Sequence, residues 1–90
     1  MVTGIVLVNV ERPRLKDVIK NVLELNGVTE VYTVAGEFDL VTIIRVETNK
    51  ELSEIVANKM PHEIDGITHT KTLVSLDMNS KVDIQELYKA

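Results

Sequence analysis

The sequence predicts an α+β fold in which two helices cover one face of a four-stranded antiparallel sheet, in the order β-α-β-β-α-β. Two observations lead to this prediction. The β-branched residues Val, Ile and Thr, which favour strands, make up 30 of the 90 residues and concentrate at 5–10, 28–34, 41–48 and 64–74. Between the first two and the last two of these runs, apolar residues recur at the three- and four-residue spacing of an amphipathic helix.

The first half of the chain reads as strand, helix and strand. Residues 5–10 form the first strand, and Pro13 suits the first turn of the helix that follows. Asn26 and Gly27 end this helix, because Gly adopts the left-handed conformation that commonly follows a last turn. The predicted buried face of the helix comprises Leu15, Val18, Ile19, Val22 and Leu23.

The second half repeats the pattern after a hairpin. Strands at 28–35 and 39–46 flank a turn at Gly36 and Glu37. Thr48 and Glu51 form a capping-box pattern for the second helix, which Pro61 is expected to stop. A long last strand then covers 67–78.

This order of elements is the ferredoxin-like split βαβ arrangement, of the dimeric α+β barrel type. We expect one domain over 1–78 and a C-terminal extension over 79–90, whose apolar residues suit a short helix.

Two strands are apolar on both faces, although two helices can cover only one. A second copy of the chain, packed sheet to sheet or along a sheet edge, would cover the other face, so we predict a homo-oligomer. The alternative is a monomer with a few exposed aliphatic residues. The first strand places Ile5 and Leu7 opposite Val6, Val8 and Val10, and the third places Leu40, Ile44 and Val46 opposite Val41 and Ile43.

Composition argues against several classes of function. A net charge of −4 disfavours direct nucleic-acid binding, and the absence of cysteine excludes thiolate metal sites and disulfides. His62 and His69 lack a third ligand at metal-binding spacing, so we expect neither a metal nor a cofactor. The longest apolar runs are four residues, and no signal peptide is recognisable, so we expect a cytoplasmic protein without a membrane span.

One cluster suggests a ligand site. Gly36, Glu37, Phe38 and Asp39 lie together at the hairpin turn, where backbone N–H groups next to a glycine could hold a carboxylate. Asp39 would then pair with an ammonium group or fix the turn. Phe38 would close the pocket or point into the core. Thr70 and Thr72 of the last strand are weaker candidates.

The segment Val31-Tyr32-Thr33-Val34-Ala35-Gly36-Glu37-Phe38-Asp39-Leu40 resembles the strand-turn-strand signature of the Lrp/AsnC transcriptional regulators. In that family it belongs to the effector-binding RAM domain (regulation of amino-acid metabolism), and the resemblance spans residues 4–78. It implies dimers that pack through their sheets and assemble into rings, with an amino-acid effector held between dimers near the turn. Ala35 replaces a threonine that is frequent in the family, and the chain starts at the first strand without a helix-turn-helix.

The prediction is therefore an amino-acid-sensing oligomeric module without catalytic activity, able to co-assemble with a full-length Lrp/AsnC regulator. One rival is a small dimeric α+β-barrel enzyme, monooxygenase- or isomerase-like, because enzymes share this topology. Such an enzyme would place His69, Lys71 or Arg45 inside an internal cavity. A third reading is an assembly partner that binds no ligand.

Overall fold

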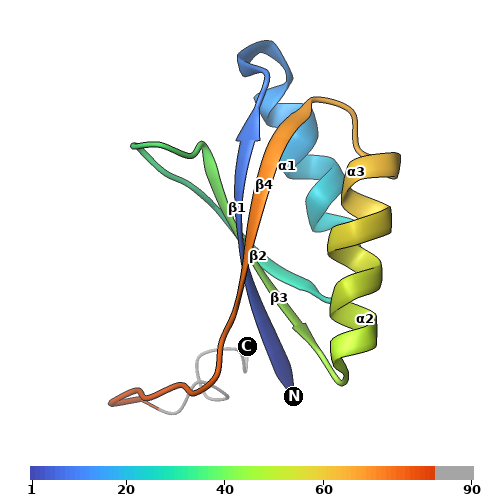
Figure 1. The fold of residues 1–90 in the computed structure, drawn as a ribbon. Coiled ribbons are helices and arrows are strands. Elements are labelled where there is room, and N and C mark those ends of the chain that lie inside the picture. The colour runs from blue at the N-terminus through green and yellow to red at the C-terminus, as the bar shows by residue number, and fades with distance from the viewer. Residues whose placement is uncertain (83–90) are drawn as a thin grey trace.

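The computed structural model describes residues 1–82 and has the predicted architecture (Figure 1). The four strands form one antiparallel sheet in the order β2-β3-β1-β4, so β1 and β3 are central, and the helices lie together on one face. The elements are β1 (Val2–Val10), a 3-10 turn (Arg12–Arg14), α1 (Leu15–Leu23), β2 (Val28–Thr33), β3 (Leu40–Val46), α2 (Asn49–Glu54), a π-helical turn (Ile55–Lys59), α3 (Met60–Glu63) and β4 (Ile67–Val74).

The core lies between the sheet and the helices. Alternate residues of β1 and β3 point into it, and Val6, Val8 and Leu40 have no exposed surface. The helical segments contribute Val18, Val22, Leu52, Ile55 and Met60, and Ile64 joins them directly after α3. No helix of the described residues is both long enough and apolar enough to cross a membrane.

The other face of the sheet has no helix over it, and we call it the open face (Figure 1). Its centre consists of the partly buried aliphatic residues that alternate with the core positions, namely Ile5, Leu7, Val41 and Ile43. The register pairs Ile5 with Ile43 and Leu7 with Val41, so the four form one contiguous apolar patch. The alternating residues that face the helices are therefore the core set, which includes Val6, Val8, Leu40 and Ile44.

The second helix does not end at Pro61 as the sequence predicts. Thr48 caps α2 as expected, since its hydroxyl accepts the Glu51 N–H at 3.1 Å, but helical structure continues through Pro61 to Glu63. Proline normally breaks a helix because its ring clashes with the carbonyl four residues earlier. Here the residues before it form a wider π turn, in which the Met60 N–H donates to the Ile55 carbonyl, five residues back.

The last strand is shorter than predicted. Pairing with β1 ends at Gly4 and Val74, and the Ser75 N–H donates to the Thr3 carbonyl at 2.9 Å just beyond it. From there the Asp77 side chain accepts local bonds from the Met78 N–H and the Asn79 amide, which compete with an extended ladder. Residues 79–82 are not helical, and the remainder of the predicted C-terminal helix lies outside the described residues.

Thr42 is an anomaly within this core. Its side chain is fully buried, and its hydroxyl is the one buried side-chain polar atom of residues 1–82 for which the structure shows no hydrogen-bond partner. Burying an unpaired hydroxyl costs about 1–3 kcal/mol.

We therefore predict that Thr42→Val, which keeps the branched shape, raises the free energy of unfolding by about 1–3 kcal/mol. Urea unfolding at fixed protein concentration measures this change. The same substitution at exposed Thr68 of β4 is the control and should change stability by less than about 0.5 kcal/mol. A Thr42→Val variant less stable than the wild type would show that the hydroxyl has a partner.

Candidate functional site

The turn between β2 and β3 is fastened to the end of β1 by Asp39. Its N–H donates to the Val8 carbonyl at 2.9 Å, and its carbonyl accepts the Val34 N–H at 3.0 Å. Its carboxylate Oδ2 accepts the N–H of Val10, the last residue of β1, at 2.9 Å. Of the two roles predicted for Asp39, fixing the turn is thus visible in the structure.

Gly36 occupies the outer part of the turn. Its φ of 141° lies in the region that favours glycine, so any other residue would be strained there. A Cβ added to Gly36 would meet no atom within 4 Å, and Glu37 beside it is exposed. The glycine is therefore required by backbone conformation rather than by crowding, and its backbone stays open to an approaching molecule.

Phe38 does not point into the core, which is one of the two positions that the sequence allows for it. The side chain is half-buried, and its ring stacks on that of His69 with centroids 6.3 Å apart and an angle of 19° between the planes. His69 lies on β4 opposite Asn9 of β1. Phe38 therefore reaches across the end of β1, because the bonds of Asp39 draw the turn over that strand.

A small cavity of about 90 Å³ adjoins the turn where Asp39 holds it. Its lining includes the charged residues Arg12 and Asp39, with Leu15 and Val34 as apolar wall. This volume is roughly that of three water molecules, which suits the ammonium and carboxylate end of an amino acid but not a large side chain. The lining does not include Gly36, Glu37 or Phe38.

Sequence reasoning missed Arg12 at this site. The residue belongs to a basic stretch before α1 that resembles an ordinary solvated helix start. Only the fold of the turn over the end of β1 brings Arg12 beside Asp39, from 27 positions away in the chain.

Thr70 and Thr72 do not join this cavity. They pair with Val8 and Val6, so both side chains lie on the helix side of the sheet at its β4 edge. Neither lines the cavity at the turn or the larger one described next.

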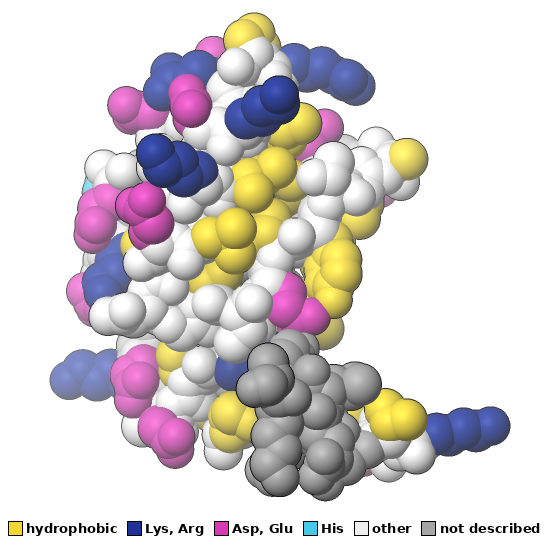
Figure 2. Space-filling model, turned by 180° about the vertical axis from the view of Figure 1, so that it is seen from behind, with side chains coloured by type: hydrophobic (Ala, Val, Ile, Leu, Met, Phe, Trp, Pro, Cys, Tyr) yellow, Lys and Arg dark blue, Asp and Glu magenta, His cyan; other side chains and the backbone are white. Residues whose placement is uncertain are grey.

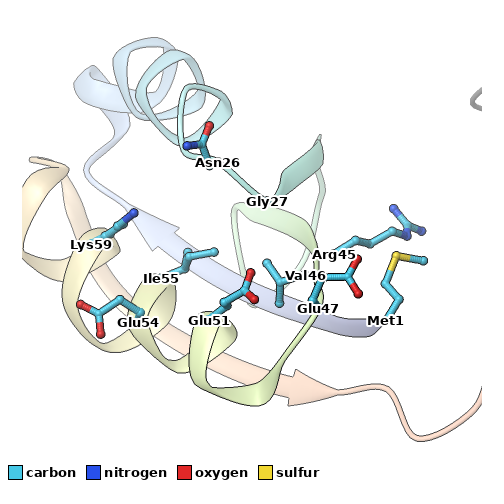
Figure 3. A pocket seen from close by; sticks show the side chains of 10 residues that line it. All are labelled: Met1, Asn26, Gly27, Arg45, Val46, Glu47, Glu51, Glu54, Ile55 and Lys59. Atoms are coloured by element: carbon cyan, nitrogen blue, oxygen red, sulfur yellow. The ribbon is translucent and has the colours of Figure 1, made fainter.

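A larger cavity of about 350 Å³ lies at the opposite end of β3, against α2 (Figure 3). Its wall on the α2 side carries Glu51, Glu54 and Ile55, and Gly27 at the start of β2 lies across from them. Arg45 also lines it, and its guanidinium donates to Glu30 at 2.8 Å and to the Thr29 hydroxyl. Four separate stretches of the chain line this cavity, so no local sequence motif predicts it.

The rival enzyme would place His69, Lys71 or Arg45 inside an internal cavity, and of these three only Arg45 lines one of the two cavities described. His69 and Lys71 are exposed on β4 and line neither of them, whereas Arg45 lies in the wall of the larger cavity, bonded to Glu30 and Thr29. Within residues 1–82, no three His, Cys, Asp or Glu side chains are grouped so that they could hold a metal ion.

The family model of the Lrp/AsnC ligand binding domain matches residues 3–81, which is nearly the whole chain. The chain belongs to the Lrp/AsnC ligand-binding domain family. This confirms the resemblance predicted from the turn signature, and it identifies the chain as an effector-binding module related to transcriptional regulators.

Individual Lrp/AsnC relatives agree with this assignment. An uncharacterized HTH-type transcriptional regulator of Pyrococcus abyssi is 37% identical over 62 residues, 69% of this chain and 41% of that protein. This chain thus spans about two fifths of such curated relatives. The crystal structure of TTHA0845 from Thermus thermophilus matches with a TM-score of 0.82 and 30% identity, covering 90% of this chain and all of that one. E. coli AsnC shares the fold, with a TM-score of 0.82 and 21% identity over 93% of this chain and 56% of AsnC.

The bond from the Val10 N–H to Asp39 gives a test of the turn. Asp39→Ala removes the acceptor and should lower the free energy of unfolding by about 1–2 kcal/mol, whereas Asp39→Asn keeps an acceptor oxygen and should cost less. Glu37→Ala, in the same exposed turn, is the control and should be nearly neutral. Equal stability of the two Asp39 variants, measured by urea unfolding, would contradict a fastening role for the carboxylate.

Proposed function

We propose that this Lrp/AsnC module senses a free amino acid at the cavity beside the β2–β3 turn. The observation that carries the proposal is the presence of Arg12 and Asp39 in one small cavity. An amino acid carries a carboxylate and an ammonium on one carbon, and a guanidinium and a carboxylate are their natural partners. Asp39 has acceptor capacity beyond its bond to Val10, because a carboxylate accepts about four hydrogen bonds.

A neighbouring subunit completes the site in this proposal. The cavity holds only the main-chain end of an amino acid, so the side chain of the ligand would extend past the exposed residues Gly36 and Glu37. A second subunit placed against the turn would surround that side chain and choose among amino acids. The family resemblance supports this arrangement, since it implies effectors bound between dimers.

The open face supports the homo-oligomer. Ile5, Leu7, Val41 and Ile43 form an apolar patch without helical cover, and sheet-to-sheet packing of a second copy would remove it from water. Closed symmetric dimers are the commonest way to cover such a surface, and dimers could then join into a ring.

The proposal also covers the partners of the module. The net charge of −4 disfavours direct DNA binding by this domain, so we propose that it acts on DNA together with a full-length Lrp/AsnC regulator assembled with it in the cytoplasm. The module would act by binding rather than by catalysis, as the regulator domains of its family do.

A thermal-shift screen against the twenty amino acids tests the sensing proposal, because a ligand that binds only the folded state raises its stability. At least one amino acid should raise the melting temperature, and Arg12→Gln and Asp39→Asn should each weaken its binding by about 10- to 150-fold. Glu54→Gln in the larger cavity is the matched control and should leave the affinity unchanged. If no amino acid binds at millimolar concentration, the ligand-free assembly partner becomes the better account.

The oligomer is tested by placing a charge on either face of the sheet. Ile43→Glu puts a carboxylate on the open face, so it should yield a folded monomer in light scattering. Val8→Glu puts the same charge into the fully buried core and should unfold the chain. A wild-type protein that is monomeric at micromolar concentration would refute the oligomer.

A further inference from the structure

Residues 75–82, which follow β4, lie outside the apolar core of the described residues, and we call them the C-terminal arm. The Ser75 N–H donates to the Thr3 carbonyl of β1. Among residues 1–82, the side-chain hydrogen bonds beyond this point stay within the arm. The Ser75 hydroxyl donates to the Asp77 carbonyl, Asp77 accepts from Met78 and Asn79, and the Ser80 hydroxyl accepts the Val82 N–H.

The arm is unusually apolar for a segment so exposed. Leu76 is 97% exposed, Met78 56% and Val82 55%. One exposed aliphatic residue is ordinary, but three in seven positions form a surface that favours burial. Hydrophobic side chains of the arm stand clear of the body of the domain (Figure 2).

The direction of the arm indicates what it could contact. After β4 the chain turns to the side of the sheet that carries no helices (Figure 1). A second copy packed against the open face would occupy that side. Leu73, the open-face residue of β4 nearest the arm, is itself 45% exposed, so the apolar surface continues from the open face toward the arm.

A stable interface buries about 800 Å² on each partner, so apolar surface beyond the centre of the open face would add to the dimer. The four central residues of that face are already partly buried. The arm brings three largely exposed apolar side chains to the same side. In a two-fold dimer each contact occurs twice, so both arms would add to the same interface.

We propose that the C-terminal arm docks on the open face of a second copy of this chain, with Leu76 and Met78 as its anchors. The proposal rests on the homo-oligomer of the proposed function. Each subunit would contact its partner through its own C-terminal arm, and the contacts of the arm would therefore contribute to the affinity of the dimer.

Sedimentation equilibrium of the full chain tests the arm through matched leucine variants. Leu76→Ser should raise the dimer dissociation constant about 100- to 10,000-fold, because a buried leucine is lost from two symmetric contacts. Met78→Ser should act in the same direction. Leu23→Ser, at a 49% exposed leucine on α1, is the control and should leave the constant unchanged. Circular dichroism should show wild-type secondary structure for all three variants, since none of these residues belongs to the core.

A second measurement separates docking on a partner from folding back on the same copy. In dimers mixed from isotope-labelled and unlabelled chains, filtered NOE spectra report contacts between copies only. We expect such contacts from the Leu76 and Met78 methyl groups to aliphatic residues of the open face, and their absence overturns the proposal. If the wild type is a dimer whose dissociation constant does not change in Leu76→Ser, the docking of the arm is refuted but the homo-oligomer is not. If the wild type is a monomer, both proposals are refuted.

Discussion

The structure depends on the packing of its helices against one face of the sheet. Side chains of β1 and β3 alternate between faces, and the helices bury Val6, Val8, Leu40 and Ile44 on one side only. That packing gives the domain its core, and it leaves an apolar patch centred on Ile43 facing water on the other side. A domain of this size buries a smaller share of its surface than a large one does, so covering the second face with another subunit is an effective way to gain stability. The homo-oligomer that we propose would thus be a consequence of how the fold distributes its apolar residues.

The candidate site depends on the same sheet through Asp39. The bond from the Val10 N–H to the Asp39 carboxylate, together with the bond to the Val8 carbonyl, ties the β2–β3 turn to the end of a central strand. Arg12 lies two residues after the end of that strand. The bonds of Asp39 to β1 therefore position both Arg12 and Asp39 at the small cavity. A ligand that contacts Asp39 would act on the turn and on the end of β1 together. In the assembly that we propose, the exposed turn would carry the effect of binding to a neighbouring subunit, because the strand it is tied to is central in the sheet.

Much of the fold follows from local sequence patterns. Where the structure differs from the sequence prediction, the difference has a physical cause. Periodicity, the Thr48 cap and the glycine after α1 predict the order of elements, and the turn signature predicts the family. Continuation of the helix through Pro61 depends on a π turn that propensities do not encode, and the end of β4 depends on the last pairing with β1 and on local bonds of Asp77. Phe38 stacks on His69, and Arg12 and Asp39 line one cavity, and in both cases segments far apart in the chain come together, which a single sequence without structure does not reveal. The larger cavity against α2 was missed for the same reason.

We propose that this Lrp/AsnC domain recognises the main-chain end of an amino acid beside the β2–β3 turn. An NMR titration of the ¹⁵N-labelled protein with the amino acid that stabilises it most tests this recognition residue by residue. We expect the largest chemical-shift changes at the amides of Arg12, Gly36 and Asp39, at the small cavity and its turn. Changes confined to Gly27, Glu51 and Ile55 would place the ligand in the larger cavity and show that the small cavity is not the binding site.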